Sequence, residues 1–230
     1  MLKKIKDWIF DLEVRFRNSF GDDISTPYKR FTAHMHLQFI DHMFLRYLWT
    51  NEFEIAPGVW RSNQPDPYRL KKFKKRGINT VLNLRGVDTY AHYLFEKEAT
   101  DALGMTLIDR KLYARKAPRP ERIMEVLETF DTIEKPFVMH CKSGADRAGF
   151  ASAIYLLDQE NAPVAEAKKM LAWKYFHQRY TKTGILDHVL DAYEERINTK
   201  GQIPFREWVQ TDYDYKGLQK KFNATPMFER

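Results

Sequence analysis

Cysteine, long apolar runs and repeated segments are scarce or absent in this chain of 230 residues. Its single cysteine, Cys141, cannot form an internal disulfide, which argues against a disulfide-stapled extracellular scaffold and favours a reducing compartment. No apolar stretch approaches the roughly 20 residues that a membrane-spanning helix needs. There is no internal repeat or low-complexity tract, and a hydrophobic content of 43% is typical of a chain that folds around a core.

Acidic residues are outnumbered, since 31 Asp and Glu accompany 38 Lys and Arg and leave a formal net charge of +7. A basic surface favours anionic partners such as nucleic acid, acidic lipid or a phosphorylated substrate. The start of the chain, MLKKIKDWIFDLEVRF, has the basic end of a signal peptide. However, Asp7, Asp11 and Glu13 interrupt what would be its apolar centre, so we expect no signal peptide and a cytoplasmic protein.

Residues 1–52 are expected to form an N-terminal helical extension. Within residues 1–20, apolar side chains recur three or four positions apart, as in an amphipathic helix: Leu2, Ile5, Ile9, Leu12 and Phe16. A second helix, rich in large apolar residues, is predicted over residues 28–49. These helices either pack on the rest of the protein or lie on the inner face of a membrane, with basic groups toward acidic headgroups. The sequence leaves both interpretations open.

From residue 53 onward, short strand-like segments alternate with helical segments. Strands are predicted within residues 53–62, 78–86, 105–113 and 135–141, with helices between and after them. Alternation of this kind predicts an α/β fold, with a small, mainly parallel sheet flanked by helices. We assign residues 53–230 to this domain.

The single cysteine lies in the stretch HCKSGADRAG, residues 140–149. It ends a predicted strand, and a tight loop separates it from a helix that begins near Arg147. Ligands of open α/β sheets bind at the carboxyl ends of strands, and a helix N-terminus offers free amides to an anion. Gly144 supplies the permissive backbone that a curled, anion-binding loop needs. Such a setting favours a thiolate at Cys141, which predicts nucleophilic attack on a phosphate ester.

HCKSGADRAG resembles the H-C-x-x-G-x-x-R phosphate-binding loop of the cysteine-dependent protein tyrosine and dual-specificity phosphatases. The upstream stretches GVWRSNQP and GINTVLNLRG agree in order and spacing, so the resemblance covers roughly residues 53–190. It implies the fold of that family and a phosphocysteine intermediate, with no metal and no cofactor. It makes Cys141 the nucleophile and Arg147 the residue that holds the phosphoryl oxygens. The loop around the phosphate would then comprise Lys142, Ser143, Gly144, Ala145 and Ala148.

Ala148 is the first departure from this family. Members usually place Ser or Thr directly after the arginine, and its hydroxyl bonds the sulfur and assists breakdown of the phosphocysteine. Alanine cannot do so, and we therefore expect a slower second step in this protein.

The second departure concerns the general acid, which the family usually carries on a loop after the strand that matches residues 105–113. Here that loop reads YARKAP and holds no acid. Two aspartates remain candidates: Asp146 within the phosphate-binding loop, a position that some relatives use, and Asp109 within the predicted strand. We favour Asp146, because geometry decides first whether an acid can reach the leaving oxygen.

Basic residues take the place of the missing acid. Arg115 and Lys116 in that loop, together with Lys142 and Arg85, are expected to flank the cleft and bind substrate. They favour a substrate with more than one negative charge, such as a phosphoinositide or a phosphorylated lipid A headgroup. We therefore predict a phosphomonoester hydrolase that acts on a phosphorylated membrane lipid, with no nucleic-acid partner. A protein tyrosine phosphatase and a catalytically weak or dead phosphate-binding module are the alternatives.

Overall fold

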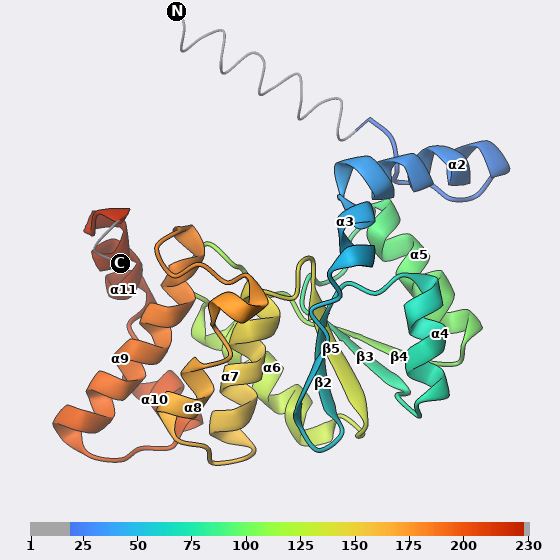
Figure 1. Ribbon diagram of the computed structural model, residues 1–230. Coiled ribbons are helices and arrows are strands. Elements are labelled where there is room, and N and C mark those ends of the chain that lie inside the picture. The colour runs from blue at the N-terminus through green and yellow to red at the C-terminus, as the bar shows by residue number, and fades with distance from the viewer. Residues whose placement is uncertain (1–18, 228–230) are drawn as a thin grey trace, which may run out of the picture.

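The computed structural model describes residues 19–227, so the amphipathic helix predicted over residues 1–20 lies almost wholly outside the described residues. A five-stranded sheet forms the centre, in the order β1-β2-β5-β3-β4 (Figure 1). Only β1 is antiparallel to its neighbour, and the other pairings are parallel. The predicted α/β class is therefore confirmed. The strands are β1 (Phe53–Ala56), β2 (Val59–Asn63), β3 (Thr80–Asn83), β4 (Thr106–Asp109) and β5 (Phe137–Cys141).

Helices cover both faces of the sheet, and Figure 1 shows them to the right and left of the strands. On one face, Leu70 and Phe73 of α4 pack against Val81 and Val138 of the sheet. α7 lies at the centre of the larger core on the other face, as its apolar sequence predicts; Phe150 is fully buried there. Because α7 follows closely on β5, this packing fixes the loop between them. The helices are α4 (Pro67–Lys75) and α5 (Ala91–Ala102) on the first face, and α6 (Pro120–Thr132), α7 (Asp146–Asp158), α9 (Ile185–Lys200) and α10 (Phe205–Thr211) on the second.

The prediction of one continuous helix over residues 28–49 is wrong. The segment consists of α2 (Pro27–Met35), a π-helical turn η1 (His36–Ile40) and α3 (Met43–Leu48). His42, between η1 and α3, has a left-handed backbone (φ 57°), which a right-handed helix cannot contain. The neighbouring Asp41 is buried among cations, so the pairing of a buried charge prevails over the helical periodicity of the sequence.

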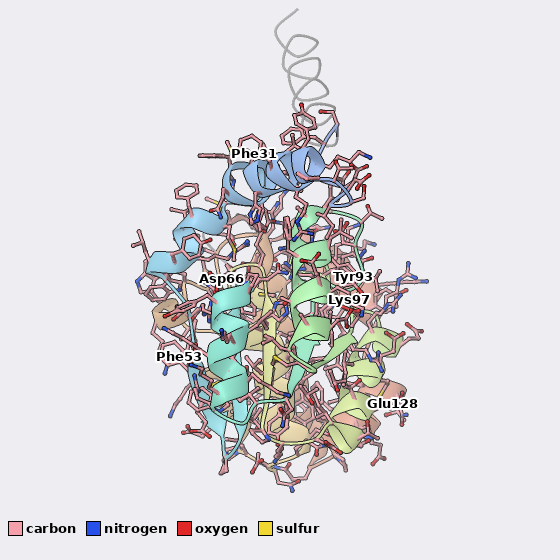
Figure 2. The ribbon with its side chains drawn as sticks, turned by 90° about the vertical axis from the view of Figure 1, so that its right-hand side faces the viewer. Phe31, Phe53, Asp66, Tyr93, Lys97 and Glu128 are labelled. Atoms are coloured by element: carbon pink, nitrogen blue, oxygen red, sulfur yellow. The ribbon has the colours of Figure 1, made fainter. Side chains whose placement is uncertain are left out.

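The segment α2–η1–α3 packs on α5 but leaves much of its apolar surface exposed. Ala33, Leu37 and Met43 meet Ala91 and Phe95 of α5 in a small separate core. Figure 2 looks onto α4 and α5, with α2 across their upper end and Phe31 labelled on it. The boundary between an extension and a domain at residue 52 remains a prediction.

The C-terminal third adds short elements around the large helical layer. They are α8 (Val164–Lys168), the 3₁₀ turns η2 (Trp173–Tyr175) and η3 (Lys182–Gly184), and α11 (Tyr215–Ala224). Within residues 19–227, no helix has the length and apolar character to cross a membrane. The same residues contain no group of three or more His, Cys, Asp or Glu side chains arranged to hold a metal ion.

Candidate active site

Cys141 is the last residue of β5, and its side chain is buried. Residues 142–145 form the loop that leads into α7, whose first residue is Asp146. Gly144 has a left-handed backbone (φ 73°), and a Cβ there would come within 2.7 Å of the Asn63 nitrogen. Only glycine therefore fits at this position. The first amides of α7 have no acceptor within their own helix, so they are available to an anion beside Cys141.

Two polar residues that the sequence analysis did not single out hold this loop in place. Arg61 of β2 donates to the carbonyl oxygens of Gly144 (2.6 Å) and Ala145 (3.2 Å). Asn51 donates to the carbonyl oxygen of Ser143 at 3.1 Å. Because the loop's carbonyl oxygens are engaged by these donors, its conformation is set by residues about 80 to 90 positions earlier in the chain.

Arg61 also brings a positive charge close to the cysteine. Its side chain is completely buried, and its guanidinium stacks 3.8 Å above the ring of Tyr175. Burial lowers the pKa of Arg61 to about 10, while the charges of Tyr175, Cys141 and Asp146 oppose that shift. Arg61 therefore stays protonated at neutral pH and attracts a thiolate at Cys141. The sequence holds one sign of this role: an arginine stands in the middle of the strand VWRSN, most of whose residues are buried.

A cavity of about 710 Å³ opens over the loop, and Lys142, Ser143, Asp146 and Arg147 contribute to its wall, whereas the buried Cys141 does not. Arg147 makes no ion pair with any residue in the described part of the chain. Its planar guanidinium is therefore free to hold two oxygens of a phosphoryl group. Basic residues outnumber acidic ones around this cavity: Arg46, Arg85, Lys111, Arg115, Lys116, Lys142 and Arg147 against Asp41, Asp88 and Asp146.

Three of these cations share the buried carboxylate of Asp41. Its oxygens lie 2.7 Å from Arg46, 2.9 Å from Arg85 and 3.3 Å from Lys142. Burial alone would raise the pKa of Asp41, but Arg85, Arg46 and Lys142 outweigh it and hold that pKa well below its usual range. Arg85 and Lys142 thus reach the cavity while paired with Asp41. One carboxylate for three cations leaves a surplus of positive charge in the wall.

Arg115 and Lys116 lie in the loop that lacks an acid, and both are exposed at the cavity wall. Neither forms an ion pair within residues 19–227. The structure thus brings all four basic residues that the sequence singled out to one cavity. Their role in substrate binding remains a prediction.

Asp146, the favoured general acid, is held by a buried histidine 31 residues further along the chain. Its Oδ1 lies 2.8 Å from Nδ1 of His177, whose Nε2 lies 2.6 Å from a carboxylate oxygen of Asp187. Burial alone would lower the pKa of His177, but its hydrogen bonds to Asp146 and Asp187 raise it to about 9. The other carboxylate oxygen of Asp146 has no hydrogen-bond partner among the described residues. It is therefore available to a leaving group.

Asp109, the other candidate acid, is not among the residues that line the cavity. It ends β4, where it accepts hydrogen bonds from Asn83 (2.7 Å) and from the hydroxyl of Tyr93 (2.8 Å).

Ala148 is fully buried in the first turn of α7. The hydroxyl of Ser152, one turn later, donates to the carbonyl oxygen of Ala148 at 2.6 Å.

The contacts of His177 predict that the protein loses stability between about pH 6.5 and pH 9. The pKa of His177 rises from its usual 6.5 to about 9 in the folded state, so folding is favoured while the imidazole is protonated. This contribution is complete below pH 6.5 and is lost as the pH rises through 9. A rise of that size corresponds to about 3 kcal/mol.

Urea unfolding of the wild type and of His177→Asn at about pH 6 and pH 9.5 measures this effect. The wild type is expected to lose free energy of unfolding over this interval, and the variant to lose much less. If both proteins show the same pH dependence, the stabilising charge does not reside on His177.

Comparison with known proteins finds that this chain is similar to phosphatases. A model of the tyrosine phosphatase family matches residues 54–166, from β1 into α8. The structure of Tk-PTP in its active form has 22% sequence identity and a TM-score of 0.52, over 65% of this chain and 99% of that chain. A phosphatase structure from Shewanella putrefaciens CN-32 has 21% identity and a TM-score of 0.51, over 62% and 90% of the two chains. At these identities the two structures support the fold. No curated protein sequence matches the chain.

Proposed function

We propose that this chain, a cysteine-dependent phosphatase whose residues 54–166 match the tyrosine phosphatase family, acts on a phosphorylated lipid at a membrane surface. In the first step, the thiolate of Cys141 attacks phosphorus and forms an S–P bond. The bond from phosphorus to the leaving oxygen breaks, and Asp146 gives that oxygen a proton. Arg147 and the first amides of α7 hold the remaining phosphoryl oxygens.

In the second step, water attacks the phosphocysteine. The S–P bond breaks, the Asp146 carboxylate takes a proton from the water, and inorganic phosphate leaves with the thiolate restored. Ala148 offers no hydroxyl to the departing sulfur. We therefore expect this step to be the slower of the two.

An exposed apolar rim beside the cavity is the main support for a lipid substrate. The rim consists of Leu45, Leu48, Trp49, Trp173 and Phe176, which are all exposed, with Leu48 at 88%. The ring of Phe176 lies 4.4 Å from that of Trp49 and 5.8 Å from that of Trp173, so the rim is continuous from α3 to η2. Leu45 also lines the cavity. Exposed aromatic and aliphatic groups of this kind insert at the boundary between headgroups and acyl chains.

Exposed apolar residues continue from the rim onto α2 and η1, where Tyr28, Phe31 and Phe39 are each more than half exposed. The exposed Lys174 of η2 and Lys182 of η3 lie close in the chain to the aromatic residues of the rim. Aromatic groups interleaved with cations fit a surface of acidic lipids, because the cations attract the headgroups while the apolar groups enter the boundary. This arrangement would bring the cavity to the level of the headgroups.

The test is phosphate release from four substrates: an aryl phosphate, a phosphotyrosine peptide, and a phosphoinositide and a phosphorylated lipid A, each presented in vesicles that contain anionic lipid. We expect the lipids to be turned over best. In Leu48→Glu/Trp173→Glu, lipid turnover should fall about tenfold or more, because the rim no longer inserts. Turnover of the aryl phosphate should stay within about twofold, because that substrate needs only the cavity.

Tyr68→Glu is the control for a charge placed at an exposed aromatic residue, since Tyr68 is as exposed as Trp173 (64%) but lies on α4. It should leave both activities unchanged. Faster turnover of the peptide than of either lipid would establish a protein tyrosine phosphatase instead. Binding of phosphate ligands without any turnover would establish a phosphate-binding module.

A further inference from the structure

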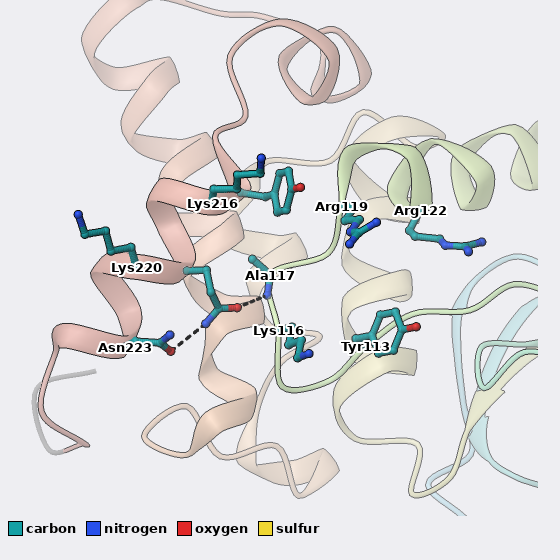
Figure 3. A pocket seen from close by; sticks show the side chains of 10 residues that line it. Tyr113, Lys116, Ala117, Arg119, Arg122, Lys216, Lys220 and Asn223 are labelled. Atoms are coloured by element: carbon teal, nitrogen blue, oxygen red, sulfur yellow. Dashed lines mark hydrogen bonds between the residues drawn. The ribbon is translucent and has the colours of Figure 1, made fainter.

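A second basic cavity lies beside the candidate active site, between α11 and residues 113–122 (Figure 3). It encloses about 660 Å³. No acidic residue lines it, and half of its lining residues are basic: Lys116, Arg119, Arg122, Lys216 and Lys220. In Figure 3, Lys216 of α11 lies opposite the segment that carries Lys116 and Arg119, and Lys220 follows one turn later on the same helix.

Most of these cations have no ion-pair partner among the described residues, and Lys216 lies 5.9 Å from the centroid of the Tyr215 ring. Arg122 pairs with Glu125 at 2.7 Å. Lys116, Arg119, Lys216 and Lys220 form no ion pair within residues 19–227, and all four are exposed. Like charges around one cavity repel one another, and an anion bound between them removes that repulsion.

The lysines of α11 are not needed to attach this helix to the protein. Phe222 anchors it in the large core, with 2% of its surface exposed. Oε1 of Gln219 accepts a hydrogen bond from the backbone nitrogen of Ala117 at 2.8 Å. Just before the helix, the hydroxyl of Tyr213 donates to the carbonyl oxygen of Pro118 at 3.0 Å. The lysines can therefore be replaced without undoing this packing.

The second cavity adjoins the candidate active site, since Tyr113 and Lys116 line both cavities. An extended anion that passes these two residues would contact both cavities. α11 lies beyond residues 54–166, the part of the chain that matches the phosphatase family. The second cavity is thus built in part by a segment outside that match.

We propose that this second cavity binds a distal phosphate group of the substrate while another phosphate of the same molecule is hydrolysed at Cys141. The substrate class is then a lipid headgroup that carries two or more phosphates. This inference rests on the proposed function and narrows it. Lysine and arginine side chains donate strong, charge-assisted hydrogen bonds to phosphate oxygens, which is the chemistry that such a group requires.

The test compares two short-chain, water-soluble lipids that are identical except that one headgroup carries one phosphomonoester and the other carries two. In Lys216→Gln/Lys220→Gln, kcat/KM for the two-phosphate lipid should fall about tenfold, mainly through KM, because charged hydrogen bonds to the distal phosphate are lost. Turnover of the one-phosphate lipid and of an aryl phosphate should stay within about twofold. An equal loss on both lipids, or no loss on either, would overturn the proposal.

Lys71→Gln/Lys75→Gln is the matched control. These two exposed lysines are also four residues apart on a helix, α4, which covers the opposite face of the sheet. This variant removes the same net charge but should leave both lipids unaffected. A loss similar to that of the α11 variant would mean that only the overall charge matters, and would contradict a site in the second cavity.

Binding of tripolyphosphate to Cys141→Ser protein separates this inference from the proposed function. The affinity for this lipid-free polyanion should fall about tenfold when Lys216 and Lys220 are also replaced by glutamine. Weaker tripolyphosphate binding in a protein that hydrolyses no lipid would refute the lipid substrate while supporting the second cavity. Unchanged tripolyphosphate binding would refute the second cavity, whether or not lipids are hydrolysed.

Discussion

Replacing Cys141 with serine is expected to abolish phosphate release from every substrate, with a loss in kcat on the order of 10⁴-fold or more. A serine hydroxyl at this position lacks the charge of a thiolate, and the surrounding positive groups, Arg61 and Arg147, cannot make it a comparable nucleophile. The measurement is phosphate release at saturating aryl phosphate, since hydrolysis of this substrate depends least on the general acid and on the membrane.

Serine is close to cysteine in size, so the buried position should accept it with the fold intact. Circular dichroism checks the fold, and binding of tripolyphosphate should persist, because the cations that hold an anion are unchanged. Release that continues in Cys141→Ser at the wild-type rate would assign the chemistry to another group. If the folded and reduced wild type releases no phosphate from any substrate, the result would contradict a phosphatase and would favour the phosphate-binding module.

Asp146→Asn is expected to slow hydrolysis of alkyl phosphates, including lipids, by about 10²- to 10⁴-fold. An alkoxide is a poor leaving group and needs a proton, which we expect Asp146 to supply. The nitrophenolate of an aryl phosphate leaves without one, so that substrate should lose far less. Asparagine can still accept a hydrogen bond from His177 through its amide oxygen, so the variant keeps the loop in place while it removes the acid.

Asp109→Asn is the control for this prediction. Asp109 is absent from the cavity wall and accepts hydrogen bonds from Asn83 and Tyr93, so its replacement should leave the rates for both leaving groups nearly unchanged. The opposite pattern, with the leaving-group dependence appearing in Asp109→Asn and not in Asp146→Asn, would transfer the role of acid to Asp109.

The order of strand, loop and helix around Cys141 could be predicted from the sequence because it is encoded locally. β5 is a short run of buried residues, Gly144 marks the turn, and α7 is apolar on nearly every side. Neighbouring parallel strands also end at one edge of a sheet, so the loop with Arg115 and Lys116 was expected near the same cleft. In these cases each residue's position follows from hydrophobic periodicity and chain connectivity.

Other features depend on contacts between residues that are far apart in the chain, and no periodic pattern in the sequence indicates these contacts. The break at His42 in the helix predicted over residues 28–49 accompanies the pairing of Asp41 with Arg85, which lies 44 residues away. Arg61 supports the loop from 83 residues away, and His177 reaches Asp146 across 31. A polar residue in a sequence does not reveal which distant partner will satisfy it on burial.

Sequence alone thus determined the class of fold, the candidate nucleophile and the candidate anion-binding loop, because local hydrophobic pattern and backbone freedom specify a strand, a turn and a helix in order. Only the tertiary structure decided what surrounds them: the buried arginine near the cysteine, the histidine that holds Asp146, the apolar rim and the second basic cavity under α11. These arise where segments far apart in the chain are packed together, and there the pairing of charges and the burial of apolar area are settled by the whole fold.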